Sequence, residues 1–178
     1  GGGSSNAASL LKFLNKRKIE DKIFNKIINL AGSDLRLFFY NQGVLQNLEK
    51  VIKFKKKYNL FFLVVYPNIK CSTKEVYSKV KNYNKKKVLK HIYKNKVALI
   101  NHILNLKNDL QSIVEKKYPV IQKLLLNISN EKGCYFSRMT GSGSACYGLF
   151  RDKRSSKVAL KRLRKKYPKF WFSIAKTI

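Results

Sequence analysis

The chain has 178 residues, 44% of them hydrophobic, and its 39 Lys and Arg against 9 Asp and Glu give a formal net charge of +30. This length suits one domain or two small ones. The longest apolar run, residues 60–66, is far shorter than the ~20 residues that a membrane-spanning helix needs. The three cysteines lie far apart without a CxxC pair, which argues against a zinc ribbon or disulfide framework and predicts a reducing, cytoplasmic setting.

The strong positive charge has two interpretations. A field of this sign attracts polyanions, so a basic α/β module that binds nucleic acid is one candidate function. Lysine far outnumbers arginine, however, and the basic residues are spread along the chain, whereas base readout and paired phosphate contacts usually recruit arginine. We therefore expect solvated, lysine-rich helix faces and no specific nucleic-acid partner, and we keep the nucleic-acid module as the alternative.

The first third of the chain combines helical and strand-like patterns. Apolar residues recur at helical spacing in residues 7–14 and again in residues 19–30, after which Gly32 is a suitable C-cap. Residues 35–40 and 44–54 are rich in the apolar and aromatic types that favour strands. We therefore predict two helices followed by two strand regions.

A buried strand is predicted at residues 60–66. Ser72 is followed three residues later by Glu75, which forms a capping box and predicts the start of a helix. Helical patterns also occupy residues 97–106 and, with an interrupting proline, residues 108–128. The region after the first strand is therefore expected to be rich in helix.

The last third of the chain alternates strands and one helix. Residues 134–138, 145–150 and 170–174 have the composition of strands, and Ser155 or Ser156 is expected to cap a helix between the last two. From residue 60 onward the order is β-α-β-β-α-β, which is typical of the ferredoxin-like arrangement. We predict a four-stranded antiparallel sheet with helices on one face.

Two glycine-rich segments are candidates for phosphate binding. Residues 1–8, Gly-Gly-Gly-Ser-Ser-Asn-Ala-Ala, run directly into a predicted helix, whose first N–H groups and dipole attract anions. Residues 139–144, Met-Thr-Gly-Ser-Gly-Ser, connect two predicted strands. Each segment alone also has an ordinary explanation, a linker for the first and a hairpin loop for the second.

Taken together with their surroundings, these segments resemble the GHMP kinase superfamily and, within it, the 4-diphosphocytidyl-2-C-methyl-D-erythritol kinases. Gly32-Ser33-Asp34 resembles the family's Gly-Ala-Asp segment, which bears the catalytic aspartate. Four further matches follow the family's order along nearly the whole chain: the phosphate loop at residues 1–8, the cytidine-binding strand-to-helix segment at residues 67–77, the helix start Asn108-Asp109-Leu110, and the C-terminal glycine loop at residues 138–145.

The resemblance implies an α+β GHMP kinase fold with two domains. Residues 1–57 would be the remnant of an N-terminal nucleotide-binding domain of the ribosomal-protein-S5-domain-2-like type. Residues 58–178 would be the C-terminal GHMP kinase domain, with the ferredoxin-like β-α-β-β-α-β order. The implied reaction is ATP- and Mg²⁺-dependent phosphorylation of the 2-hydroxyl of 4-diphosphocytidyl-2-C-methyl-D-erythritol in the non-mevalonate isoprenoid pathway. Another GHMP kinase of small molecules is the alternative within the superfamily.

The resemblance also implies roles for single residues. Asp34 would orient the acceptor hydroxyl and take its proton. Thr73 and Tyr77 would bind the cytidine end of the substrate, with the Tyr77 ring stacked on the base. Ser5 is the candidate for a magnesium-facing hydroxyl. The remaining implied contacts are ATP phosphates at Gly1, Gly2, Gly3, Ser4, Ser5 and Asn6, and substrate at Gly141, Ser142 and Gly143.

The chain also departs from the family pattern. Leu35 and Arg36 stand where the family commonly has Val-Pro, Lys74 where Pro is frequent, and Tyr77 where Phe is frequent. In the family a further segment precedes the phosphate motif and supplies a catalytic lysine and part of the nucleotide pocket. We therefore expect this chain to be inactive alone, with its second domain the more self-sufficient part.

Overall fold

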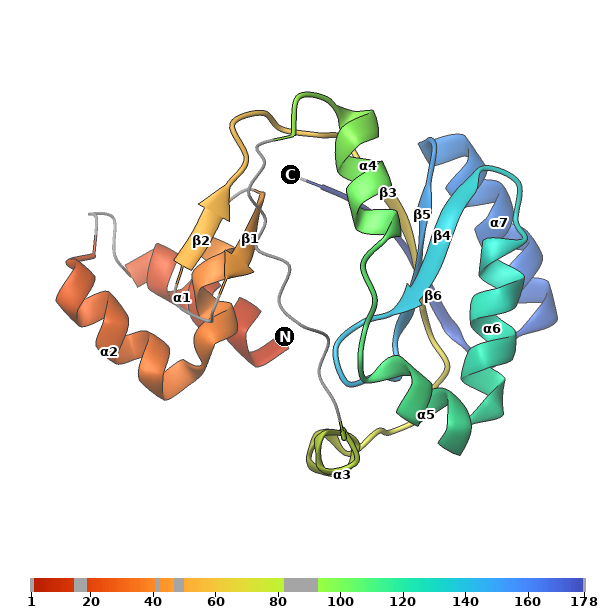
Figure 1. Cartoon of the computed structure of the whole chain (residues 1–178), viewed down its shortest axis with the longest axis horizontal. Helices are drawn as coiled ribbons and strands as arrows, with labels where there is room; N and C mark the ends of the chain where they lie inside the picture. Colours follow the sequence, from red (N-terminus) through yellow and green to blue (C-terminus); the bar gives the residue numbers. More distant parts are fainter. Residues whose placement is uncertain (1, 15–18, 41, 47–49, 82–92, 178) are drawn as a thin grey trace. The chain divides into compact units, whose positions relative to one another are not determined.

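A computed structural model of the chain gives the fold (Figure 1). The structure describes residues 2–14, 19–40, 42–46, 50–81 and 93–177. These residues form two compact units, which divide in the sequence between Lys57 and Tyr58. This division says nothing about the functions predicted for the two domains, and those functions stay predictions.

The first unit is built from helices and one hairpin. Two α-helices, α1 (Gly2–Leu14) and α2 (Asp21–Ala31), are followed by the 3-10 helix η1 (Ser33–Phe39). Strands β1 (Gly43–Gln46) and β2 (Lys50–Lys53) pair antiparallel. The two predicted helices are therefore confirmed, and the second predicted strand region is a hairpin.

The core of the first unit joins α1, α2 and η1. One buried residue from each element forms its centre: Ala8 of α1, Ile28 of α2 and Leu35 of η1. The rings of Phe24 and Phe39 meet edge to face, with centroids 4.8 Å apart. The small core is therefore made by helix–helix contacts.

Residues 35–40 do not form the predicted strand. The backbone of Gly32, with φ of +98°, ends α2 by donating its N–H to Ile28 O at 2.8 Å, and η1 begins at the next residue. Short apolar runs are compatible with either a strand or a buried helix. Here the helical turns place Leu35 and Phe39, four residues apart, in the same cluster.

The first glycine-rich segment is also not a loop. Gly2 and Gly3 already belong to α1, so the described part of this segment is the beginning of a helix. Gly1 lies outside the described residues. Glycine is a poor helix former, which is why sequence patterns place a loop there.

The second unit contains the larger sheet and most of the helices. Its elements in chain order are β3 (Phe61–Tyr66), α3 (Thr73–Ser78), α4 (Lys96–Leu104), α5 (Gln111–Lys117), α6 (Pro119–Ser129), β4 (Cys134–Met139), β5 (Cys146–Phe150), α7 (Lys153–Lys166) and β6 (Trp171–Lys176). All four predicted strands are present within one or two residues of their expected bounds. None of the described helices combines the length and the apolar composition needed to cross a membrane.

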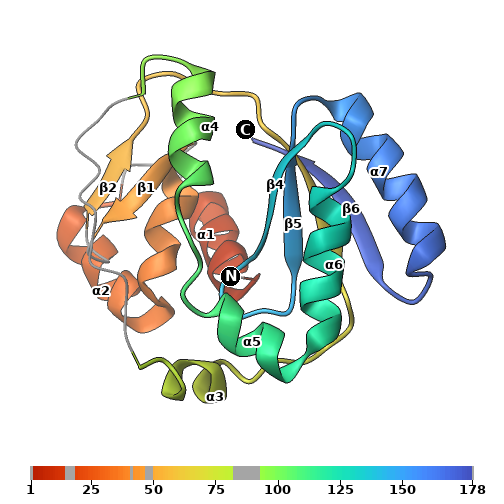
Figure 2. The ribbon, with the colours of Figure 1, turned by 45° about the vertical axis from the view of Figure 1, so that its right-hand side comes forward.

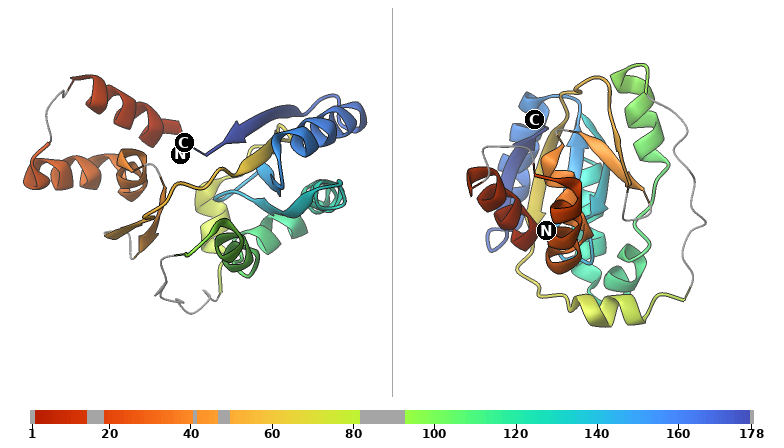
Figure 3. Two further views of the ribbon diagram at one scale, coloured as in Figure 1. Left: turned by 90° about the horizontal axis from the view of Figure 1, so that it is seen from above. Right: turned by 90° about the vertical axis from the view of Figure 1, so that its left-hand side faces the viewer.

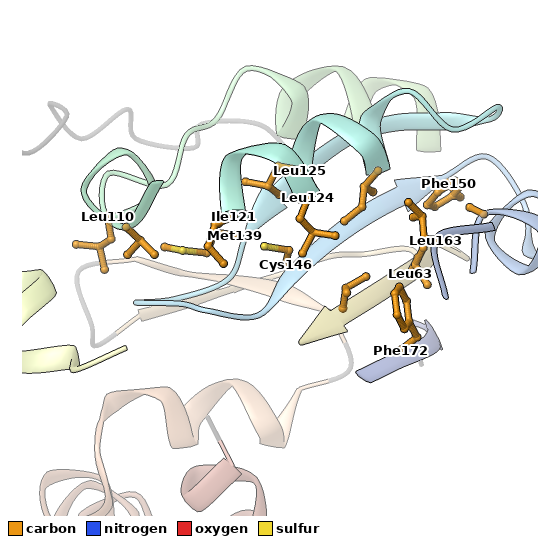
Figure 4. Packing of buried hydrophobic residues seen from close by; sticks show 14 of the residues in the cluster. Leu63, Leu110, Ile121, Leu124, Leu125, Met139, Cys146, Phe150, Leu163 and Phe172 are labelled. Atoms are coloured by element: carbon orange, nitrogen blue, oxygen red, sulfur yellow. The ribbon is translucent and has the colours of Figure 1, made fainter. Parts of the chain in front are cut away.

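The sheet of the second unit has the strand order β4-β5-β3-β6, and all neighbouring strands are antiparallel. This confirms the predicted ferredoxin-like sheet. Helices α6 and α7 cover one face (Figures 2 and 3). Leu63, Phe150 and Phe172 of the sheet pack there with Leu124 of α6 and Leu163 of α7 (Figure 4).

The prediction that helices cover only one face is incomplete, because α4 lies on the other face. Met139 of β4 belongs to the core under α6 and α7, so its neighbour Arg138 points to the opposite side of the sheet. There the Arg138 guanidinium donates to Ile103 O of α4 at 3.1 Å. The polar residue in the middle of β4 therefore anchors a helix.

Two helix starts test the capping predictions. Ser72 Oγ accepts from the Glu75 N–H at 3.3 Å, which confirms Ser72 as the N-cap of α3. Helix α7 is capped instead by Asp152, whose carboxylate accepts from the Ser155 N–H at 2.7 Å. Ser155 and Ser156 lie inside the helix, so the prediction that one of them is the cap was wrong. Asp152 also provides negative charge at the positive end of the helix dipole.

Candidate active site

The N-terminal turn of α1 is one candidate phosphate site. Gly2, Gly3, Ser4 and Ser5 form this turn, which contains no acidic residue. The first four N–H groups of an α-helix have no partner within the helix, and the dipole adds positive potential there. Ser4 and Ser5 are half-buried, while Asn6 is exposed. The turn therefore offers backbone and hydroxyl donors to an anion.

Asp34 lies in η1 with its side chain exposed. The next residue, Leu35, is 0% exposed and packs with Ala8 of α1. The backbone directly after Asp34 is therefore held in place by the core. Lys12 of α1 also donates to Phe38 O of η1 at 2.6 Å. Helix α1 and the segment that carries Asp34 are therefore held together by one core.

Two of the departures from the family pattern have structural roles beside Asp34. Leu35 is the buried anchor described above. Arg36 donates to Asn25 Oδ1 at 2.9 Å, and its guanidinium lies 6.0 Å from the centre of the Phe24 ring. Both residues fasten η1 to helices α1 and α2. Leu35 and Arg36, which replace the Val-Pro common in the family, thus fix the backbone next to Asp34 through their packing.

The second glycine-rich segment is a tight turn between β4 and β5. Thr140 N–H donates to Ala145 O at 2.9 Å, and Gly143 N–H donates to Thr140 O at 3.1 Å. Gly141 and Gly143 have φ angles of +55° and +91°. These angles favour glycine, so the turn needs both residues for its backbone course.

The structure brings this turn to helix α3. Thr73 Oγ1, at the start of α3, lies 3.0 Å from Ser142 Oγ, so the two hydroxyls share a hydrogen bond. Tyr77, one turn further along α3, is 50% exposed. Thr73 and Ser142, predicted from segments 69 residues apart, are therefore neighbours, and the Tyr77 ring has a free surface for stacking.

Asn108 has a role that the sequence did not reveal. Its Oδ1 accepts from the Leu110 N–H at 3.0 Å, as expected for a residue at a helix start. Its Nδ2 also donates to both Met139 O and Gly141 O at 2.9 Å. Nearby, Gln111 Oε1 accepts from the Met139 N–H at 3.0 Å. These side chains therefore hold the glycine turn, and because the acceptors lie 31 and 33 residues away, no local pattern indicates the contact.

A charged cluster fixes the position of α3. Glu75 accepts from Lys117 of α5 at 2.6 and 2.7 Å and from Lys79 at 2.8 Å. These hydrogen bonds, first from Lys117 and then from Lys79, lower the pKa of Glu75 from 4.5 to about 2. The cluster ties the helix that carries Thr73 and Tyr77 to the body of the second unit.

The Glu75 cluster predicts a pH-dependent stability. Because the pKa of Glu75 is lower in the folded chain, its stabilisation is present above about pH 4.5 and is lost as the pH falls towards 2. Urea unfolding of the wild type between pH 5 and pH 2.5 is expected to show falling stability, and Glu75→Gln a flatter profile. An equally steep profile for Glu75→Gln would contradict this account.

The two turn glycines give a matched pair of substitutions. A Cβ at Gly143 would lie 2.8 Å from Met139 Sδ, whereas a Cβ at Gly141 would meet no atom within 4 Å. Gly141→Ala is expected to cost about 1 kcal/mol for its positive φ, and Gly143→Ala about 2–4 kcal/mol because overpacking is added. Urea denaturation measures both, and equal costs would refute the argument.

Asn108 and Asn105 provide a second pair of matched substitutions. Asn108→Ala removes two donors from the turn and is expected to lower stability by about 2 kcal/mol. Asn105 Nδ2 makes one exposed bond, to Asn101 O at 2.8 Å, so Asn105→Ala is expected to change stability by less than ~0.5 kcal/mol. Unfolding curves for the two variants check the contrast, and similar losses would show that Asn108 does not hold the turn.

Magnesium would find few protein ligands here. Within the described part of the chain no group of three or more His, Cys, Asp or Glu side chains could hold a metal ion. Mg²⁺ usually takes one or two protein oxygens and completes its shell with water and substrate phosphates. The hydroxyl of Ser5, beside the free N–H groups at the start of α1, fits such a site.

Part of the chain matches a described protein family. Residues 88–169 match the family described as GHMP kinases C terminal. The match lies largely within the second unit, whose sheet has the ferredoxin-like strand order described above.

The whole chain is also similar to individual proteins. Over 182 residues the chain is 35% identical to the 4-diphosphocytidyl-2-C-methyl-D-erythritol kinase of Pelagibacter ubique, covering 100% of this chain and 64% of that protein. The enzyme of the same name from a Wolbachia of Brugia malayi is 30% identical over 183 residues, covering 100% of this chain and 63% of the relative. The chain thus spans a little less than two thirds of these relatives.

Solved structures show the same fold. A crystal structure of 4-(cytidine 5'-diphospho)-2C-methyl-D-erythritol kinase superimposes with a TM-score of 0.69 at 20% identity, covering 98% of this chain and 65% of that one. Homoserine kinase from Cytophaga hutchinsonii gives a TM-score of 0.55 at 12% identity, covering 95% and 61%. The similarity therefore extends through both units of the chain.

Proposed function

We propose that this chain is the larger part of a kinase that transfers the γ-phosphoryl group of ATP to the 2-hydroxyl of 4-diphosphocytidyl-2-C-methyl-D-erythritol. The observation that carries the proposal is the end-to-end similarity, at up to 35% identity, to kinases named for that substrate. The reaction would belong to isoprenoid precursor synthesis by the non-mevalonate route, in the cytoplasm.

In this proposal the first unit performs the transfer. The helix end at Gly2–Ser5, with Asn6, would bind the ATP phosphates, which suits its free N–H groups. Asp34 would hold the acceptor hydroxyl and receive its proton while the hydroxyl oxygen bonds to the γ-phosphorus and ADP leaves. An exposed carboxylate on an anchored segment is suited to this role because phosphoryl transfer depends mainly on alignment.

Magnesium would neutralise negative charge on the transferred γ-phosphoryl group and on the departing ADP. On the protein side, the Ser5 hydroxyl is the proposed contact, with Ser4 beside it. The positive end of the α1 dipole would supplement the metal's charge.

The second unit would recognise the substrate. Thr73 and Ser142 share a hydrogen bond at the junction of α3 and the glycine turn, and their hydroxyls would bind the polar end of the molecule. The half-exposed ring of Tyr77 would stack on cytosine. Gly141 would let the turn approach the substrate closely, because a Cβ there would meet no protein atom within 4 Å and its space is open. Gly143 would contribute its backbone to the same turn.

We further propose that the chain alone is inactive, because it corresponds to only 64% of its Pelagibacter relative. The test uses a hybrid protein in which this chain replaces the matched part of that relative. With ATP, Mg²⁺ and the cytidyl substrate, the hybrid is expected to form ADP and the phosphorylated product at a rate within about tenfold of the relative's. Full turnover by the 178-residue chain alone would refute this second proposal, and an inactive but folded hybrid would count against the first.

A further inference from the structure

Helix α7 contains a concentration of basic residues that phosphoryl transfer does not use. Eight of its 14 residues are Lys or Arg and none is acidic, compared with 39 of 178 in the whole chain. Four of the seven arginines in the sequence also lie within residues 151–164. A general bias towards lysine therefore does not account for this helix.

Four of the eight basic residues of α7 form a line along its outer side. Its inner side is buried in the core through Ser156, Ala159 and Leu163. With 3.6 residues per turn, the opposite side carries one basic residue per turn over about 16 Å. We call these four exposed residues the basic stripe: Arg154, Lys157, Lys161 and Lys165.

The basic stripe lacks acidic counterparts among the described residues. Among the described residues, α7 makes an ion pair through Arg162, whose guanidinium nitrogen lies 3.7 Å from a carboxylate oxygen of Glu131. Arg162 is not part of the stripe. Lys157, Lys161 and Lys165 follow one another at intervals of four, where like charges repel on a helix. A polyanion placed along the stripe would remove this repulsion.

The surroundings of the stripe favour one class of polyanion. Helices that lie on anionic membranes need an exposed apolar side, but the apolar side of α7 faces the core, and Val158 is its one large exposed hydrophobic residue, at 44%. Single strands are usually held by aromatic stacking as well as charge, and α7 has no aromatic residue. A double helix, with one phosphate charge per ~1.7 Å, needs only a rigid row of cations.

We propose that the basic stripe of α7 binds the phosphate backbone of double-helical nucleic acid without reading its sequence. This function is independent of the proposed kinase reaction, because none of the four residues belongs to the candidate active site. It also agrees with the expectation that no specific nucleic-acid partner exists, since phosphate contacts carry no sequence information.

The test compares two variants of the full chain with equal charge. One carries Gln at Arg154, Lys157, Lys161 and Lys165. The control carries Gln at four exposed lysines of the first unit: Lys22, Lys26, Lys55 and Lys56. Binding to a 20-base-pair DNA duplex is followed by fluorescence anisotropy from 50 to 200 mM salt. The stripe variant is expected to lose at least ~30-fold in affinity and about 3–4 units of the log–log salt slope, while the control loses less than ~3-fold.

Equal losses in both variants would overturn the proposal, because they would show a general effect of net charge. An unchanged affinity of the stripe variant would overturn it as well. Vesicles of mixed phosphatidylcholine and phosphatidylserine provide the third arm. Binding to them that depends on the stripe and persists in excess duplex would assign the surface to membranes instead. Circular dichroism verifies that each variant is folded before binding is measured.

Discussion

Replacing Asp34 by Asn in the hybrid protein is expected to lower kcat by about 10³-fold. The amide keeps the shape of the side chain and its exposure in η1, but it cannot accept the proton of the acceptor hydroxyl, and general bases of this kind contribute about 10²- to 10⁴-fold. The affinities for ATP and for the cytidyl substrate are expected to stay within about threefold, because the proposed phosphate and base contacts are made by other residues.

A nearby carboxylate provides the control for Asp34. Glu20 is exposed, precedes α2 and makes no side-chain capping bond, so Glu20→Gln removes the same charge from the same unit and is expected to leave kcat within about twofold. Single-turnover rates separate the chemical step from product release. A wild-type rate for Asp34→Asn would remove this residue from the mechanism, and comparable losses in both variants would indicate an effect of charge alone.

Replacing Tyr77 by Ala is expected to raise KM for the cytidyl substrate by about 10- to 100-fold. Base–aromatic stacking is worth about 1–3 kcal/mol, and the 50% exposed ring on α3 has the free surface that stacking requires. The change is expected in KM and not in kcat, because the proposed contact to the cytidine end would be equally strong before and during phosphoryl transfer.

The matched variant for this prediction is Tyr77→Phe. It keeps the ring and removes the hydroxyl, so KM is expected to change by less than about threefold. A large effect of Tyr77→Phe would show that the hydroxyl binds the substrate, and a small effect of Tyr77→Ala would show that the ring does not stack on the base.

The pattern of the sequence predicts the second unit well and the first unit less well. The strands around residues 60–66 and 145–150 form the centre of a sheet, and their apolar runs have few alternatives. In the first unit, residues 35–40 have the same kind of composition, but residues 35–39 belong to a 3-10 helix, because Gly32 ends α2 directly before this helix and Leu35 packs against α1. Tertiary contact decides between strand and helix in such short runs.

The candidate site shows a similar limit. A local pattern finds Ser72 as a cap because its partner is three residues away. The cap at Asp152 is missed because two serines follow it at positions that also suit capping. The contact of Asn108 with Gly141, 33 residues away, and that of Thr73 with Ser142 depend on the fold and have no local signal.

The charge of the chain illustrates a third limit. Along the sequence the 39 basic residues are spread widely, and only the helix geometry of α7 shows that four of them form one row. The side chains of α7 that face the core establish which residues face solvent. Periodicity combined with burial therefore identifies a surface that composition alone assigns to solvation.

The most direct test of the kinase proposal is the identity of the phosphorylated product. The hybrid protein is incubated with ATP, Mg²⁺ and equimolar 4-diphosphocytidyl-2-C-methyl-D-erythritol and homoserine, and the products are analysed by phosphorus NMR and mass spectrometry. We predict one new phosphomonoester, on the 2-hydroxyl of the cytidyl substrate, with one ADP formed per product and no phosphohomoserine. Phosphorylation of homoserine instead, or release of ADP without a phosphorylated acceptor, would contradict the proposal.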